Sequence, residues 1–253
     1  MTVTAADHAN AARVATEAGE LLLEVRVALE NENAHSHYVK AAGDRVSHDF
    51  IVEALEALYP EDAILSEEGA DDPVRLGAER VWIVDPLDGT NEFGEPGRRD
   101  WAVHVALVIA GHVVAAAVAL PALGLTFTDD PPPPPVEPIG DRRVRMVVSR
   151  SRPPAMTAVL QRRLDAELVP LGSAGAKAMA VVSGEVDMYA HHGGQFEWDS
   201  AAPIGVAAAA GLHVSRLDGS PLVYNRPDPW LPDLLICKPE LVEPALAAIH
   251  QYL

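Results

Sequence analysis

The chain has few cysteine, aromatic and basic residues. Its single cysteine, Cys237, excludes a disulfide framework and a cysteine-based metal site. Cys237 follows the apolar run 234–236, so we expect a small buried hydrophobic residue. Lys and Arg together number 19 against 37 Asp and Glu, which gives a net charge of −18. So acidic a chain argues against nucleic acid and anionic membranes as partners.

The sequence also lacks a secretion signal. The apolar stretch 21–29 is interrupted by charged residues, so it does not fit a signal peptide, and we expect the protein in the cytoplasm. Residues 102–125 are almost uncharged and long enough to span a membrane. Gly111-His112 falls near the middle of that stretch, and apolar residues alternate with others before it. This pattern predicts two antiparallel strands rather than a membrane helix.

The remaining pattern predicts an α/β protein whose first half is α+β. Helices are expected at 5–29 and from 46 to 58, with a polar loop at 31–43 between them, and strands at 63–66 and 81–84. Five consecutive prolines, Pro131–Pro135, can only be extended, so we expect an exposed linker that separates a half at 1–140 from a half at 141–253. The second half is predicted to contain strands at 144–149, 186–190 and 234–237, paired strands around 218–219, and helices at 153–166, 174–183, 199–210 and from about 240.

Two acidic clusters follow predicted strands. Asp85 and Asp88 come at the end of the run 81–84, where Pro86 stops the strand and Gly89 permits a tight turn. Glu67 follows the strand at 63–66. Ligands of open α/β sheets collect at the carboxyl ends of strands, so these acids could face one another. Oxygen-only ligands of this kind suit Mg²⁺. Taken alone, Asp85 and Asp88 would fit a solvated surface turn equally well.

Three motifs resemble the inositol monophosphatase superfamily of Mg²⁺-dependent, Li⁺-sensitive phosphatases. Residues 82–93, W-I-V-D-P-L-D-G-T-N-E-F, resemble its D-P-[IL]-D-G-T signature, and Trp198-Asp199-Ser200-Ala201-Ala202 resembles its W-D-x-A-A signature. Ser66-Glu67-Glu68 matches as well, in the expected order. The resemblance implies a layered α-β-α-β-α sandwich, a small phosphate ester as substrate, two or three Mg²⁺ ions and a homodimer.

The resemblance also implies roles for individual residues. One Mg²⁺ would be held by Glu67, Asp85 and the carbonyl of Leu87; a second by Asp85, Asp88 and Asp199; and a third, weaker one near Glu67. Asp44 with Thr90 would orient and deprotonate a water molecule, although the approach 40–44, K-A-A-G-D, lacks the threonine usual in the family. The expected substrate contacts are Gly89, Thr90, Ser149, Gly172, Ser173, Lys177 and Asp199.

Within the superfamily, three segments look most like CysQ-type bisphosphate nucleotidases, which remove one phosphate from 3'-phosphoadenosine 5'-phosphate (PAP) in sulfate assimilation. These segments are 149–152 (S-R-S-R), 172–177 with its Lys177, and 222–225. Tyr224 and the loop His191-His192 are candidate surfaces for the purine. Inositol monophosphatase and fructose-1,6-bisphosphatase activities are the alternatives inside the family, and an inactive acidic metal-binding module is the alternative outside it. Residues 172–177 do not form a Walker A motif, because Lys177 does not follow a glycine directly.

Overall fold

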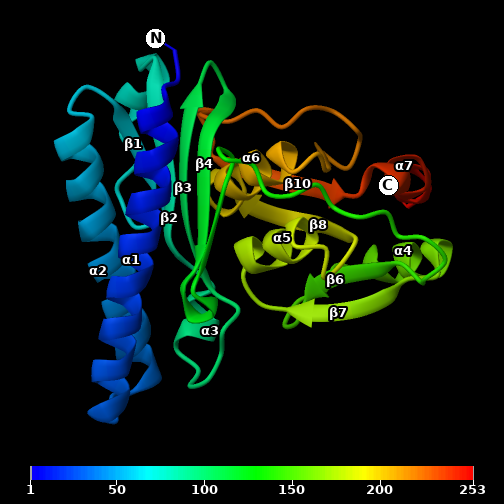
Figure 1. Ribbon diagram of the computed structural model, residues 1–253, viewed down its shortest axis with the longest axis horizontal. Coiled ribbons are helices and arrows are strands. Elements are labelled where there is room, and N and C mark those ends of the chain that lie inside the picture. Colours follow the sequence, from blue (N-terminus) through cyan, green and yellow to red (C-terminus); the bar gives the residue numbers. More distant parts are fainter. Residues whose placement is uncertain (1, 253) are drawn as a thin grey trace.

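The computed structural model describes residues 2–252, and two long helices open it (Figure 1). Helix α1 (Ala5–Asn31) confirms the predicted first helix, and α2 (Ser36–Leu58) follows after four residues. The loop expected at 31–43 is therefore wrong from Ser36 onward. In α2 the buried residues recur every four positions, beginning at Val39, among polar ones, so the first turns read as polar loop in the sequence.

The first sheet has the order β1-β2-β3-β4-β5. Its strands are β1 (Ala63–Ser66), β2 (Arg80–Asp88), β3 (Ala102–Ile109), β4 (His112–Leu120) and β5 (Leu125–Thr128). Strand β1 runs parallel to β2 with Ser66 opposite Val84, which brings Glu67 beside Asp85. Strands β3 and β4 form the predicted hairpin, whose turn residues Ala110 and Gly111 both have positive φ.

The second sheet has the order β7-β6-β8-β10-β9. Its strands are β6 (Arg145–Ser149), β7 (Glu167–Leu171), β8 (Met188–Phe196), β9 (His213–Ser215) and β10 (Trp230–Cys237). Strand β7 was not predicted, because Pro170 argues against a strand interior; the strand lies at the sheet edge, where proline is tolerated. Strand β8 continues through the expected loop at His191. Strand β9 pairs with β10 rather than with a strand after Gly219.

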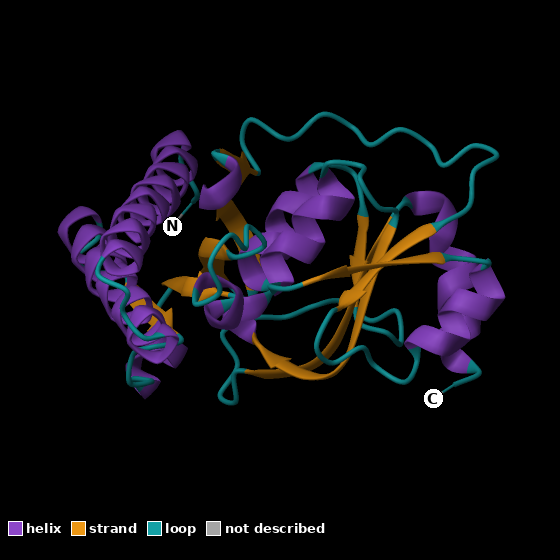
Figure 2. Cartoon of the chain, turned by 90° about the horizontal axis from the view of Figure 1, so that it is seen from below, coloured by secondary structure: helices purple, strands orange, loops and turns teal. Residues whose placement is uncertain are grey.

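Helices separate and cover the two sheets, as Figures 1 and 2 show. Helices α1 and α2 cover the outer face of the first sheet; α5 (Ala174–Val182) and α6 (Ala201–Ala209) lie between the sheets; α4 (Thr157–Leu164) and α7 (Val242–His250) cover the second. Three separate clusters of buried apolar residues fill the spaces between these layers. The layered α-β-α-β-α sandwich is confirmed. Helix α4 begins at Thr157, after two prolines, rather than at 153.

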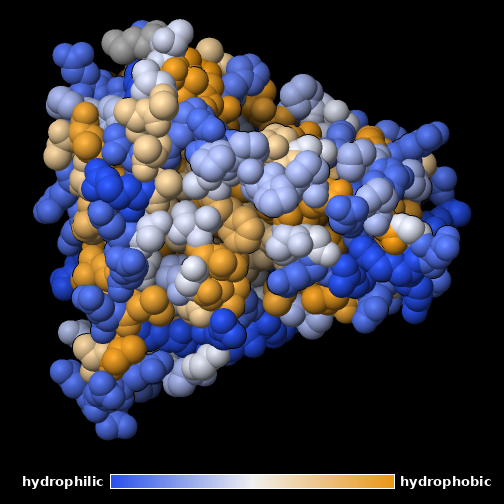
Figure 3. All heavy atoms as spheres, viewed as in Figure 1, coloured by the Kyte–Doolittle hydropathy of each residue, from blue (hydrophilic) through white to orange (hydrophobic). Residues whose placement is uncertain are grey.

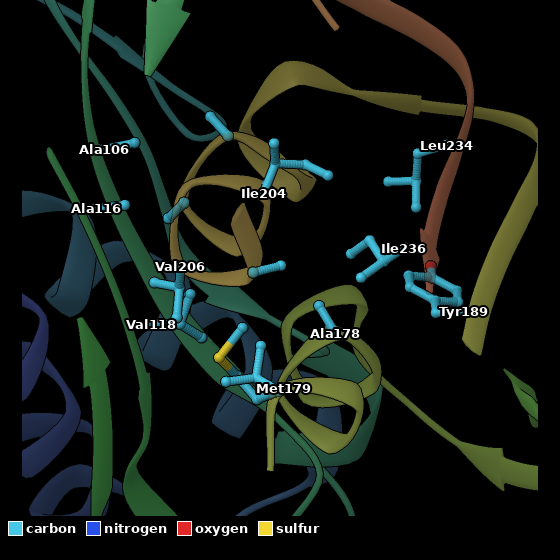
Figure 4. Packing of buried hydrophobic residues seen from close by; sticks show 14 of the residues in the cluster. Ala106, Ala116, Val118, Ala178, Met179, Tyr189, Ile204, Val206, Leu234 and Ile236 are labelled. Carbon is cyan, nitrogen blue, oxygen red and sulfur yellow. The ribbon is translucent and has the colours of Figure 1, made fainter. Parts of the chain in front are cut away.

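The central cluster fixes α5 and α6 against both sheets (Figure 4). Met179 of α5 and Val206 of α6 lie near Val118 of the first sheet, while Ile236 approaches from the second. Helix α6 sits close to β4 because Gly205 has no side chain: a Cβ there would lie 2.6 Å from the Cβ of Ala116. Helices α5 and α6 are therefore packed against both sheets.

The proline-rich segment 129–144 runs as a long loop from the first sheet to the far end of the second (Figure 2). It is held there by Lys238 Nζ, which donates to the Glu137 carbonyl at 2.6 Å, and by Ile139 N, which donates to Glu240 at 3.0 Å. The strands of the first sheet all precede residue 140 in the chain, and those of the second sheet all follow it. The division of the chain into two units at that residue stays a prediction.

Polar side chains cover most of the face seen in Figure 3, and apolar ones gather between the α1/α2 layer and α5. Among the helices formed by residues 2–252, none combines the length and the apolar character needed to cross a bilayer. The apolar stretch at 102–125 forms strands, as predicted. Cys237 is a free, buried thiol, also as predicted.

Candidate active site

The end of β2 carries two buried carboxylates. The pairing of β2 with β3 is irregular between Asp85 and Asp88, and both buried side chains lie at the carboxyl end of β2. The backbone N–H of Leu87 donates to Asp85 Oδ1 at 3.1 Å. One oxygen each of Asp85, Asp88 and Asp199 lies within 4.8 Å of the others. The structure thus brings together three of the carboxylates that the sequence singled out.

Asp199 reaches this cluster from a short 3₁₀ turn, Glu197–Asp199, which precedes α6. The helix expected to begin at Asp199 begins at Ala201 instead. Asp199 Oδ2 accepts a hydrogen bond from the Phe196 backbone N–H at 2.6 Å, which fixes the carboxylate at the end of β8. Its position therefore depends on the second sheet, whereas Asp85 and Asp88 belong to the first.

The negative charges of the cluster oppose one another. Burial, and then the charge of Glu67, raise the pKa of Asp85 well above its usual range. Burial and the charge of Asp199 raise the pKa of Glu67 to about 7, and burial and the charge of Asp88 raise the pKa of Asp199 to about 6. Such shifts mean that these carboxyls lack sufficient positive charge nearby. A divalent cation with a preference for oxygen ligands fits this donor set, and Glu67 lies beside Asp85 but outside the group of three.

Asp44 and Thr90 form a second polar pair beside the cluster. The Thr90 hydroxyl lies 3.3 Å from Asp44 Oδ1 and 3.2 Å from the Leu87 carbonyl oxygen. Burial, and then the charge of Glu68, raise the pKa of Asp44 to about 6, a value suited to accepting a proton near neutral pH. Although the segment before Asp44 lacks the threonine usual in the family, Asp44 still lies beside Thr90. It belongs to α2 rather than to a loop.

Thr90 begins the four-residue helix α3 (Thr90–Phe93), and Gly89 precedes it with a φ of 90°. A side chain at Gly89 would be strained, and its Cβ would lie 3.0 Å from the Ser173 side chain. The predicted turn and helix start at Gly89 and Thr90 are therefore confirmed.

The loop before α5 binds Asp88. The Ser173 hydroxyl donates to Asp88 Oδ2 at 2.5 Å, the Gly175 N–H donates to the same oxygen at 2.6 Å, and the Ala174 N–H donates to Oδ1 at 3.0 Å. Burial favours the protonated form of Asp88, but the contact with His104 and these donors outweigh it, so the pKa of Asp88 is lowered. Asp88 therefore stays a carboxylate.

Lys177 does not extend toward solvent. Its ammonium group is buried and donates to the backbone carbonyls of Gly172 and Ser173, and it lies 5.3 Å from the centre of the Tyr189 ring. Burial lowers the pKa of Lys177. Lys177 therefore supports the loop that carries Ser173, and its contact with substrate stays a prediction.

The other predicted substrate contacts lie at different depths. Ser149 ends β6, opposite Leu171 and so next to Gly172. Arg150 pairs with Asp100 at 2.7 Å. Tyr224 is buried, with its hydroxyl 3.2 Å from Ser200 Oγ, so its proposed role as a flat surface for a purine is wrong.

Two residues of the site were missed in the sequence. His104 lies in β3 against Asp88, and Asp100 accepts hydrogen bonds from the Gly172 N–H at 2.6 Å and from Arg150. The only signal for His104 was a polar residue in an otherwise apolar strand. Asp100 gave no local signal, because its partners are some 50 and 72 residues further along the chain.

Comparison with known proteins agrees with this geometry. Residues 2–252 match the model of the inositol monophosphatase family. The chain belongs to that family. A relative from Mycobacterium leprae, named 3'-phosphoadenosine 5'-phosphate phosphatase, is 49% identical over 97% of this chain and 94% of its own. The 3'(2'),5'-bisphosphate nucleotidase CysQ of Escherichia coli is 33% identical over 75% of this chain and 81% of its own.

Solved structures of the inositol monophosphatase family share the fold. Inositol monophosphatase II from Staphylococcus aureus superposes with a TM-score of 0.78 over 98% of this chain and all of that chain, at 20% identity. CysQ from Bacteroides thetaiotaomicron has a TM-score of 0.75 over 92% of this chain and 97% of its own, at 26% identity. Phosphatases of the family are metal-dependent, and the acidic cluster gives this chain a matching site.

Proposed function

We propose that the protein is a Mg²⁺-dependent phosphomonoesterase that hydrolyses PAP to AMP and phosphate, in the context of sulfate assimilation. The observation that carries this proposal is the Asp44–Thr90 pair beside three clustered carboxylates. A protein that only bound metal would not need that pair. The relatives named for PAP and for bisphosphate nucleotides support the choice of substrate.

Mg²⁺ would be held by Glu67, Asp85, the Leu87 carbonyl, Asp88 and Asp199, in two or three sites. When bound, it would acidify a water molecule and stabilise the leaving oxygen. Asp44 takes the proton of the attacking water through the Thr90 hydroxyl, while the water oxygen forms a bond to phosphorus and the ester P–O bond breaks. The departing 3'-oxygen of the nucleotide takes up a proton from water and becomes a hydroxyl. The N–H groups of Gly89 and Thr90 are placed to donate to phosphate oxygens.

The second phosphate of PAP needs a cation away from the carboxylates. Because Lys177 is buried against backbone carbonyls, we assign this contact to the 149–152 segment, where Arg150 is one-third exposed and Arg152 is exposed. Both lie beyond Ser149 at the end of β6, next to the Gly172–Ser173 loop. From the family resemblance we also expect a cytoplasmic homodimer.

Phosphate release from three substrates tests the proposal. With Mg²⁺ present, kcat/KM for PAP should exceed that for inositol 1-phosphate and for fructose 1,6-bisphosphate, because only PAP offers a second phosphate together with a purine. A higher kcat/KM for either sugar phosphate would overturn the nucleotidase assignment and leave the metal mechanism standing. No release from any of the three would favour the inactive metal-binding module.

A further inference from the structure

His104 is a fully buried imidazole on the apolar inner face of the first sheet. On β3 its neighbours on the same face are Ala102 and Ala106, both members of the central cluster. A polar ring in such a place is costly unless its nitrogens meet suitable partners. The folding of an apolar sheet does not require it, so its contacts need another explanation.

The two ring nitrogens of His104 face two different parts of the active site. Nδ1 lies 3.0 Å from the carbonyl oxygen of Trp198, which can only accept a hydrogen bond, so Nδ1 donates. Nε2 lies 3.2 Å from Asp88 Oδ2, a close polar contact that falls short of full hydrogen-bond geometry. One side chain thus joins Asp88 to the residue preceding Asp199.

The surroundings of His104 are shaped to keep this contact. A Cβ on Gly175 would lie 2.1 Å from His104 Nε2, so only glycine lets the first turn of α5 pass the ring. The Gly175 N–H and the Ser173 hydroxyl donate to the same Asp88 Oδ2. Oδ2 is therefore occupied by protein donors, while Oδ1 has one donor, the Ala174 N–H, and a lone pair left for a cation.

We propose that His104 is a positioning residue, whose Nε2 contact turns Asp88 so that Oδ1 faces the cation. This inference rests on the proposed metal site. Removing a group that orients a ligand typically weakens metal binding by ~10- to 100-fold. Loss of His104 should therefore act on Mg²⁺ affinity before it acts on substrate.

Two conservative variants separate the two contacts. In His104→Gln the terminal amide nitrogen stands where Nε2 stood and keeps the contact with Asp88, but the Trp198 contact is lost. In His104→Asn the amide nitrogen stands where Nδ1 stood and keeps the Trp198 contact, but the Asp88 contact is lost. His213→Asn on β9, whose partner is Ser215, is the matched control.

The measurement is Mg²⁺ affinity of each free protein, by calorimetry and by the rise in Tm on adding Mg²⁺, with no substrate present. The dissociation constant should rise at least ~10-fold in His104→Asn and stay within ~3-fold of the unmutated protein in His104→Gln and His213→Asn. Equal weakening in both His104 variants, or none in either, would overturn the proposal. If His104→Asn does not fold, His104→Gln decides the question. Weakened Mg²⁺ binding by His104→Gln overturns the proposal, and unchanged binding supports it. Failure of the unmutated protein to bind Mg²⁺ would instead refute the metal site.

Discussion

Asp187 is the centre of a buried charge network outside the catalytic motifs, and its removal allows a quantitative prediction. Arg142 donates to both of its carboxylate oxygens, at 2.5 and 2.6 Å, the Arg145 N–H donates at 2.8 Å, and Lys238 Nζ lies 3.0 Å away. The side chains of Asp187 and Lys238 are 0% and 2% exposed. The network also holds the proline-rich segment, through the bond from Lys238 to Glu137.

Asp187→Asn keeps the shape of the side chain but leaves Lys238 buried without its counter-charge. Breaking a buried pair in this way costs about 3–5 kcal/mol, and we expect about 3 kcal/mol because the Glu137 carbonyl still accepts from Lys238. Asp165→Asn is the matched control. Its pair with Arg143 has a similar distance, 2.7 Å, but the two side chains are 81% and 61% exposed, so the loss should be below about 1 kcal/mol.

The pH dependence gives a second reading of the same network. Burial alone would raise the pKa of Asp187. Arg142, the Arg145 N–H and Lys238 have the larger, opposite effect and lower this pKa from an ordinary 3.8 to about 2. A lowered carboxyl pKa contributes stability above the unfolded pKa, and this contribution disappears as the pH falls through the folded pKa. The shift corresponds to about 2 kcal/mol. The gap between unmutated protein and Asp187→Asn should therefore be full at pH 6 and narrow between pH 4 and pH 2.

Urea unfolding followed by circular dichroism measures both effects. The two variants are compared at pH 6, and Asp187→Asn is compared with the unmutated protein down the acid range. If Asp187→Asn costs no more than Asp165→Asn, burial does not make this network stabilising, and the reasoning fails. A gap that stays constant to pH 2 would contradict the lowered pKa.

Three further predictions concern the site. Asp85→Asn should keep the fold by circular dichroism and lower Mg²⁺-dependent turnover by at least ~100-fold, since one preorganised charge is lost; near-normal turnover would refute the metal assignment. Millimolar Li⁺ should inhibit, and less so as Mg²⁺ rises, because it can fill a carboxylate site at half the charge; indifference to Li⁺ in rate assays would argue against the Asp88/Asp199 site. Lys177→Met should lower kcat/KM for PAP and inositol 1-phosphate alike, because Lys177 supports the Ser173 loop; a loss confined to PAP would mean that it binds the second phosphate.

Local patterns predicted the elements that carry the catalytic acids. The run 81–84 and the turn at Gly89 are specified by near neighbours, so the strand end and the start of α3 were predictable. The hairpin of β3 and β4 was predictable for the same reason. The rule that ligands gather at strand ends predicted that Glu67 could face Asp85, and the parallel pairing of β1 with β2 brings the two residues side by side.

Features that depend on distant partners were not predictable. Lys177 is two residues after Gly175 in a glycine-led turn, which suggests a phosphate contact, yet the fold closes over it and gives it backbone carbonyls instead. Tyr224 was predicted to offer a flat surface to the purine, but it packs into the central cluster. His104 acquires its role only when β3, the α5 turn and the Trp198 carbonyl meet.

The position of the site at the junction of the two sheets has an energetic consequence. Asp85 and Asp88 come from the first sheet, and Asp199 comes from the turn that follows β8 of the second sheet. Packing the two sheets together therefore brings three negative charges close to one another. Their raised pKa values show that this approach is unfavourable for Asp85 and Asp199. At Asp88 the contact with His104 and the donors of the Ser173–Gly175 turn outweigh this repulsion, whereas at Asp199 the Phe196 N–H does not. The remaining repulsion between Asp85 and Asp199 can be neutralised by a bound cation. His104 and the turn before α5 contact Asp88 mainly at Oδ2, so they leave Oδ1 available to that cation.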